Sequence, residues 1–471
     1  EPFANKTAGE SSVTILHSNL SPTTLFTRWA ALFDGTPRCV LATRTGVGIL
    51  LDKLGALVID SAERTEHNQY DMNPRFDVRS VAWDMHTRTK CQLIYSSIAP
   101  RLEELETQSS SVIPAKAGIQ TSKSSRRDSF LHEPIIVNMK DELRARGRGY
   151  ISERLVDEIR LALASGKSAF LFLNRTGTSR MITCRDCAQM LSCSSCGNPF
   201  RAASSQLICD RCSIRQPLPA CCPSCRSVRF HFIALGTEKI VELAQKEFPD
   251  TRVIEITQQS LLKDGDTLRH ALIVGTSYLP RACPEAFFDI GCVGVLSGDP
   301  IVSLSDFRTE ERHVQMLFEL KRLAAIGEAA FVVQTFSPES RHIKAVTSED
   351  YGAYAREALA ERKEHGWPPF SILIRLRRTS SQRSSLSSRR RPGSSLKKIS
   401  TKDTYSDNST TGDPTSSMIH LGASLRSKTS DSLLFSIPQP AVPSTDLPEN
   451  LQNFLSSLPN DWLIDIDPVL V

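Results

Sequence analysis

Eight cysteines of this chain form four Cys-x-x-Cys pairs between residues 184 and 225. A Cys-x-x-Cys turn places two thiolates on one side of a tight loop, and two such turns supply the tetrahedral sulfur cage that zinc prefers. A redox role or a disulfide would fit one isolated pair, whereas four pairs so close together favour structural zinc. The array therefore predicts two zinc ions.

The spacing of the pairs favours a nested arrangement. Twelve residues separate Cys196 from Cys209, enough for a small hairpin, so the second and third pairs can close on one ion. Closing the first pair on the second would leave only residues 188–192 between them, which is cramped. Cys221 has no partner at this spacing, because position 224 is Ser. The predicted ligand sets are Cys184, Cys187, Cys222 and Cys225 for one ion, and Cys193, Cys196, Cys209 and Cys212 for the other.

Composition places these thiols in a reducing compartment. The chain has 471 residues, 40% of them hydrophobic and 23% charged, which is ordinary globular composition for about three domains. It contains no apolar run long enough to span a bilayer, and "EPFANKTAGESS" lacks the features of a secretory signal. We therefore expect a cytoplasmic protein, in which a count of 13 cysteines favours metal binding over disulfides. The missing initiator Met suggests that the sequence starts inside a longer gene product.

The net charge of +5 is concentrated in one segment. Residues 377–402 hold nine Lys or Arg and no acid, so the rest of the chain sums to 5 − 9 = −4. This Ser-rich segment is typical of a solvated linker, or of an arm that binds nucleic-acid phosphates through residues such as Arg389, Arg390 and Arg391. Residues 181–230 carry six Arg and two Asp, but two four-thiolate zinc sites add about −2 each. A near-neutral zinc module favours a scaffold or protein-docking role.

The flanks of the cysteine array predict an α/β fold. Leu155, Ile159 and Leu163 fall on one helical face, and "SAFLFL" follows as a buried strand. The tripeptide at 166–168, Gly-Lys-Ser, imitates a phosphate-binding loop, but it lies between a helix and a strand and lacks the earlier glycine. Strands and helices then alternate on both sides of the array, which indicates parallel sheets. The sequence thus predicts two α/β lobes, with the zinc module inserted in the second.

Several motifs together resemble one family. They include "VTILHSNLS", "VLATRTGV", "NPRFDVRSVA", "FLFLNRTG", the whole cysteine array, "LIVGTSYL", "LSDFRTEER" and "GWPPFS". With these motifs the chain resembles the PriA family of replication-restart helicases over nearly all its length. The resemblance implies two RecA-like lobes that hydrolyse ATP with Mg²⁺ and move 3′ to 5′ along DNA, and a zinc module with nested cysteine pairing that assists unwinding and primosome assembly.

The catalytic motifs depart from the family pattern. Where the family has Asp-Glu-Glu-His, residues 60–63 read Asp-Ser-Ala-Glu, so Asp60 could still hold Mg²⁺, but Ser61 replaces the water-orienting Glu. Where the family has Ser-Ala-Thr-Pro, residues 97–100 read Ser-Ile-Ala-Pro. The family's arginine-rich run is replaced in the region of Lys321 and Arg322. The family's N-terminal DNA-binding region and phosphate-binding loop are expected before residue 1, or to be absent.

These observations lead to one architecture and three functional hypotheses. The first hypothesis is a PriA-like protein, monomeric, that binds zinc, DNA forks and primosome proteins but has lost ATP-dependent helicase activity. The second is an active ATP-dependent helicase, and the third is a structural zinc protein or decaying gene fragment. The expected domains are a remnant of the first lobe (1–106), a low-complexity insertion (107–132), the second lobe (133–180 and 231–345) around the zinc module (181–230), and an α+β C-terminal domain (346–471) with a basic Ser-rich segment (377–415).

Overall fold

The computed structural model divides the chain into two compact units, Glu1–Ser96 with Arg362–Val469, and Ser97–Glu361 with Leu470–Val471. Both the insertion predicted at 107–132 and Arg389, Arg390 and Arg391 lie outside the described residues. The structure describes residues 13–33, 39–47, 54–69, 76–105, 133–146, 150–174, 180–184, 186–187, 191–194, 200–203, 206–209, 214–233, 236–257, 268–299, 307–378, 424–428, 432–438, 453, 455–456 and 462–466.

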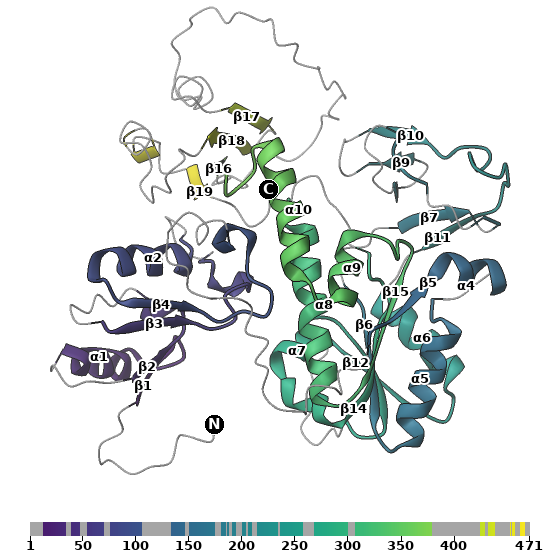
Figure 1. Cartoon of the computed structure of the whole chain (residues 1–471), viewed down its shortest axis with the longest axis horizontal. Helices are drawn as coiled ribbons and strands as arrows, with labels where there is room; N and C mark the ends of the chain where they lie inside the picture. The colour runs from purple at the N-terminus through teal and green to yellow at the C-terminus, as the bar shows by residue number, and fades with distance from the viewer. Residues whose placement is uncertain are drawn as a thin grey trace, which may run out of the picture. The chain divides into compact units, whose positions relative to one another are not determined.

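The larger unit is built on a six-stranded parallel sheet (Figure 1). Its strand order is β12-β13-β6-β14-β15-β5. All residues of β6 and β13 are buried, because their runs of apolar side chains are covered on both faces of the sheet. The strands are β5 (Ile135–Asn138), β6 (Ser168–Phe172), β12 (Arg252–Ile256), β13 (Ala271–Gly275), β14 (Ile290–Val295) and β15 (Ala330–Thr335).

Helices cover both faces of this sheet. On one face pack α4 (Met139–Arg146), α5 (Glu153–Ala164) and α6 (Thr237–Glu247), and on the other α7 (Tyr278–Ala282), α8 (Thr309–Ile326) and α9 (Arg341–Ser348). Leu155 and Ile159 on α5 are fully buried, as their helical spacing predicts. The predicted α/β fold with parallel strands is confirmed. Within the described parts of the chain, no helix is both long and apolar enough to cross a bilayer.

The Gly-Lys-Ser tripeptide lies in the turn between α5 and β6, as its helix–loop–strand order predicts. Lys167 Nζ donates to the carbonyl oxygen of Gly327 at 2.7 Å, and Ser168 Oγ donates to that of Leu268. Both side chains therefore bind backbone at the amino edge of the sheet, whereas phosphate-binding loops follow the carboxyl end of a strand. The tripeptide is a structural element of the sheet.

Residues 97–105 belong to the larger unit. The amide of Leu102 donates to Glu311 on α8 at 2.9 Å, and Gln315 on the same helix donates to the carbonyl of Ala99 at 3.2 Å. The hydroxyl of Tyr351, at the start of α10 (Tyr351–His365), donates to the carbonyl of Pro100. This segment contains the altered motif at 97–100, so that motif is anchored on α8 and α10.

The smaller unit contains two isolated parallel pairs. In one pair, β1 (Val13–Leu16) joins β2 (Cys39–Ala42) with α1 (Pro22–Ala30) as crossover; in the other, β3 (Ala56–Ile59) joins β4 (Gln92–Tyr95) with α2 (Val78–Thr89). An antiparallel sheet of order β17-β18-β16-β19 completes the unit. Its strands are β16 (Ser371–Arg378), β17 (Ser424–Lys428), β18 (Ser432–Pro438) and β19 (Trp462–Ile466).

Candidate metal centre

A small antiparallel module is inserted between β6 and α6. It is entered through β7 (Arg180–Cys184) and left through β11 (Phe230–Ile233), and these two strands pair directly, with Cys184 opposite Phe230. The remaining strands are β8 (Arg201–Ala203), β9 (Gln206–Ile208) and β10 (Arg215–Pro217). Among the residues of the module that the structure describes, few apolar side chains are buried, Ile182 and Phe200 among them, so this core is small. A module of this size needs a further source of stability, which a structural metal can supply.

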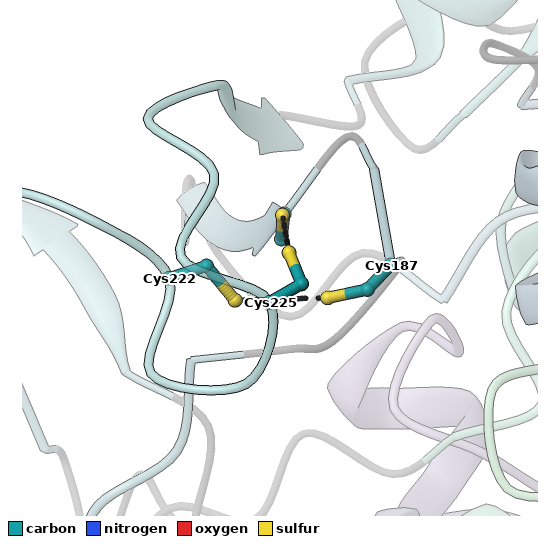
Figure 2. Close-up of side chains that lie close together, drawn as sticks. Cys187, Cys222 and Cys225 are labelled. Atoms are coloured by element: carbon teal, nitrogen blue, oxygen red, sulfur yellow. Dashed lines mark hydrogen bonds between the residues drawn. The ribbon is translucent and has the colours of Figure 1, made fainter.

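Four cysteine sulfurs converge at one end of the module (Figure 2). Cys184 ends β7 and Cys187 follows in the next turn, while Cys222 and Cys225 lie in the turn before β11. All four Sγ atoms lie within 4.8 Å of one another, with Cys184 and Cys225 at 3.5 Å and Cys187 and Cys222 at 3.6 Å. A tetrahedral zinc with Zn–S bonds of about 2.3 Å holds its sulfurs about 3.8 Å apart. The cluster therefore has the dimensions of a zinc cage and brings together the first and fourth pairs.

Backbone and side-chain contacts shape the two turns. The amide of Cys222 donates to the carbonyl of Ser227 at 2.7 Å, and the amide of Arg226 donates back to the carbonyl of Cys222. Arg226 takes a left-handed conformation with φ of 61°, which closes the turn. Arg229 pairs with Asp186, which lies between the two cysteines of the first turn. Hydrogen bonds from Ser227 and Arg229 hold the pKa of Asp186 below its usual range. This ion pair ties one turn to the other.

The electrostatics of the cluster favour thiolate at Cys184. Burial raises the pKa of this thiol, but hydrogen bonds from the backbone amides of Cys187 and Asp186 outweigh it and lower the pKa to about 7. At Cys225 the backbone of Ser227 and the sulfur of Cys187 lower the pKa, but burial and the sulfurs of Cys184 and Cys222 raise it more. Zinc binds the thiolate form, so a thiol with a lowered pKa is prepared for it. Four sulfur donors and no open position fit a structural zinc site.

The second predicted cage is only half described. Cys193 and Cys209 are both buried and pack in the same small core, while Cys196 and Cys212 lie outside the described residues. The amide of Cys209 donates to the carbonyl of Ile214 at 2.8 Å, which closes a turn after β9. The second zinc ion therefore remains a prediction. Cys221 is exposed and lies outside the four-sulfur cluster.

Asp60 directly follows β3 in the smaller unit. Its carboxylate accepts a hydrogen bond from Ser96 Oγ, at the end of β4, at 3.1 Å. Ser61 has a left-handed φ of 50°, and its hydroxyl lies 3.5 Å from the second carboxylate oxygen. Because β3 and β4 are parallel, their carboxyl ends meet at one edge, where Mg²⁺ is commonly held by one or two carboxylates and substrate phosphates. Sequence reasoning identified Asp60 and Ser61 but not Ser96.

Sequence reasoning also missed the residue that holds the loop after β3. The guanidinium of Arg79, almost completely buried, makes two hydrogen bonds to Asp77 at 2.7 Å. It also donates to the carbonyls of Ala62 and Arg64 and to the side chain of Asn68. The spacing Asp-x-Arg at a helix start was the available signal, because an N-terminal Asp and an Arg two residues later can pair.

The two cations near the lost arginine run differ in environment. Lys321 on α8 is buried, and its Nζ donates to the carbonyl of Val346 at 3.0 Å and to Glu349 at 2.6 Å. It therefore stabilises the end of α9. Arg322 is exposed.

Comparison with known proteins identifies one group of relatives. The chain matches replication restart protein PriA of Bacillus subtilis with 27% identity over 376 residues, which are 77% of this chain and 46% of the relative. It matches replication restart protein PriA of Synechocystis with 28% identity over 394 residues, 80% of this chain and 46% of the relative. The Haemophilus influenzae protein of the same name is 25% identical over 378 residues, 76% of this chain and 50% of the relative. No family model matches. The chain spans about half the length of these relatives.

Proposed function

We propose, from the premise that the chain belongs to the PriA family of replication restart proteins, that it binds zinc and forked DNA and works with primosome proteins in the cytoplasm. In this proposal the strands β1 to β4 belong to the first RecA-like lobe and the six-stranded sheet of the larger unit belongs to the second lobe, which carries the zinc module. The chain acts as a monomer that recognises DNA structure and does not translocate.

The four-sulfur cluster carries this proposal. It combines the dimensions of a zinc cage with a position between β6 and α6, so the metal would fix the module on the carboxyl side of a central strand. Bound zinc would have four protein ligands, so its contribution is to folding. Cys193, Cys196, Cys209 and Cys212 supply the second ion in this proposal.

We assign no ATP hydrolysis to the residues of this chain. Phosphoryl transfer depends on a phosphate cradle, Mg²⁺, an oriented water and a cation on the developing charge. Asp60 fits the role of a Mg²⁺ ligand, but Ser61 offers a hydroxyl where the family has a carboxylate, and Lys321 binds Glu349. The Gly-Lys-Ser tripeptide binds backbone carbonyls. The competing hypothesis of an active helicase requires DNA-stimulated ATP hydrolysis that depends on Asp60.

DNA binding is assigned to the basic segment and the two units. The nine cations at 377–402 are uncompensated by acids in that segment, whereas thiolate charge offsets the arginines of the zinc module. Each phosphate contact releases counterions, so affinity falls with salt in proportion to the number of contacts. Replacing Arg389, Arg390 and Arg391 with Ser should weaken DNA binding. It should also reduce the slope of log affinity against log salt concentration by the amount expected for roughly three phosphate contacts.

The test is binding of the full chain to a labelled forked duplex, measured by fluorescence anisotropy at several salt concentrations, with zinc quantified in the same preparation. The proposal expects zinc-loaded protein that prefers the fork to a blunt duplex. The triple Ser variant should keep its zinc, which separates the basic segment from the metal. Zinc-loaded protein that binds neither the forked nor the blunt duplex would instead support the hypothesis of a structural zinc protein.

A further inference from the structure

Two sulfur–sulfur contacts in the four-sulfur cluster join its two turns. Cys184 Sγ lies 3.5 Å from Cys225 Sγ, and Cys187 Sγ lies 3.6 Å from Cys222 Sγ (Figure 2). Each contact connects the turn after β7 to the turn before β11. The sulfurs of a disulfide lie about 2.05 Å apart, so a side-chain movement of about 1.5 Å would close either contact.

Each contact pairs a buried cysteine with a more accessible one. Cys184 and Cys222 are buried, whereas Cys225 is exposed and Cys187 is half-buried. A cysteine that senses oxidants is an accessible thiolate beside a second sulfur that resolves its oxidised form. Cys225 and Cys187 therefore fit the reacting role, and Cys184 and Cys222 fit the resolving role.

Contacts that do not involve a metal also hold the two turns together. The strands β7 and β11, which border the turns, pair directly with each other. Arg229, after the second turn, forms an ion pair with Asp186 in the first. The amide of Cys222 donates to the carbonyl of Ser227 at 2.7 Å, which fixes the second turn. The sulfurs of the two turns therefore stay close to one another while each thiolate reacts.

We propose that this cluster is a redox switch, in which hydrogen peroxide forms one disulfide between Cys184 and Cys225 and another between Cys187 and Cys222. At each pair the accessible thiolate attacks the peroxide, the O–O bond breaks, and a sulfenic acid forms. The buried thiolate then displaces the oxygen as water, and the S–S bond forms. Two thiolates, one peroxide and two protons thus give one disulfide and two waters, with sulfur oxidised and oxygen reduced. Disulfide sulfurs do not bind zinc as thiolates do, so the cage releases its ion.

The oxidised module keeps its two turns linked. The disulfides replace the metal as the connection between β7 and the turn before β11, and such cross-links restrict the unfolded chain. We therefore expect the oxidised module to stay folded, whereas removal of zinc under reducing conditions unfolds it. In a reducing compartment the disulfides are transient, and their reduction allows zinc to bind again.

Oxidation also changes the charge of the module. One Zn²⁺ and four thiolates sum to 2 − 4 = −2, whereas two disulfides carry no charge. The six arginines within residues 181–230 then lose part of the negative charge that offsets them. The oxidised module is therefore more basic, which favours contact with phosphates.

The test exposes the zinc-loaded full chain to hydrogen peroxide and measures released zinc with a chromophoric chelator. About two equivalents of peroxide per cage should release the ion, because each disulfide consumes one peroxide. Limited proteolysis within residues 181–230 should be about 10-fold slower for the oxidised module than for the reduced module stripped of zinc. Dithiothreitol together with zinc should reverse both changes. Cys221→Ser is the matched control, because Cys221 is exposed but lies outside the cluster, and it should respond as the unmodified chain does.

Trypsin distinguishes disulfides between the turns from disulfides within them. Cleavage after arginine places Cys184 in residues 181–185, Cys187 in residues 186–201, and Cys222 and Cys225 together in residues 216–226. Mass spectrometry without reduction should find both of the first two peptides linked to the third, and fragmentation should assign the links to the two proposed pairs. A link between the first two peptides would place the disulfides within the turns and refute the switch.

Two further outcomes would overturn the proposal. In the first, the four cysteines of zinc-loaded protein stay reduced, or pass to sulfinic acid without disulfides, at peroxide concentrations that modify the half-buried Cys283 of the larger unit. In the second, the oxidised module is cleaved as fast as the reduced module stripped of zinc. The inference rests on the zinc assignment of the proposed function, so zinc is quantified before oxidation. Protein isolated without zinc would contradict both, whereas zinc-loaded protein without these disulfides would contradict the switch alone.

Discussion

Replacing Cys184 with Ser should release one zinc ion and unfold the zinc module. Cys184 is fully buried at the end of β7, its Sγ lies 3.5 Å from that of Cys225, and its lowered pKa makes it the sulfur best prepared to bind as thiolate. A Ser hydroxyl at this position is a poor zinc ligand and leaves a buried polar group in the cluster. The change therefore removes both a metal bond and the group that joins β7 to the turn before β11.

The magnitude follows from the number of ligands. Structural zinc in small modules contributes about 10–16 kcal/mol at neutral pH, so one of four thiolates accounts for roughly 3 kcal/mol, which is more than 100-fold in zinc affinity. Competition with a chromophoric chelator measures this loss directly. Near-ultraviolet circular dichroism and limited proteolysis within 181–230 should show that the module unfolds, while the six-stranded sheet of the larger unit keeps its thermal transition.

Cys221→Ser is the matched control, because Cys221 adjoins Cys222 in sequence but is exposed and lies outside the four-sulfur cluster. It should keep full zinc content and affinity. The reasoning fails if Cys221→Ser loses as much zinc as Cys184→Ser, or if Cys184→Ser binds zinc as tightly as the unmodified chain.

Three further predictions concern the two units. Burial lowers the pKa of His313 and of His342 to about 4, so the folded state holds both side chains neutral. The free energy of unfolding should therefore be highest above pH 6.5 and decrease as the pH falls toward 4, because the unfolded chain takes up these protons first. Between pH 7 and pH 5 the loss should be about 2 kcal/mol per histidine. Urea unfolding should show a shallower pH dependence in His313→Gln, and an unchanged slope would contradict this. A Cβ on Gly327 would lie 2.1 Å from a backbone oxygen, so Gly327→Ala should destabilise the larger unit by about 3 kcal/mol in thermal unfolding, whereas Gly236→Ala, with open space around it, should change little. ATP hydrolysis with forked DNA should stay at background and be the same in Asp60→Ala; DNA-stimulated turnover abolished by this substitution would refute the loss of activity.

The cysteine array shows how far spacing alone can predict a site. Nested pairing rested on the five residues between the first two pairs, too few for a comfortable cage, and the structure brings the sulfurs of the first and fourth pairs together. Spacing could not predict the supports of the cluster. The ion pair of Arg229 with Asp186 and the left-handed Arg226 depend on how β7 and β11 meet in space. Those contacts arise from tertiary packing, which a ligand pattern does not encode.

The larger unit was predictable because its strands are locally consistent with their final environment. Runs such as residues 168–172 and 271–275 are apolar on both faces, bounded by turns and alternate with helices, and a parallel sheet buries both faces. The anchoring of residues 97–105 was not predictable in this way. It depends on hydrogen bonds with Glu311, which accepts, and with Gln315 and Tyr351, which donate, all more than 200 residues away in sequence.

In the smaller unit, the strands are less buried than their apolar composition predicts. Residues 13–16 and 56–59 are as apolar as the strands of the larger sheet, so sequence alone predicts burial on both faces. In the structure Thr14 and Leu16 are buried in the first segment and Ile59 in the second, on the sides that α1 and α2 cover. Apolar residues on a permanently solvated face would add aggregation risk without stabilising the fold.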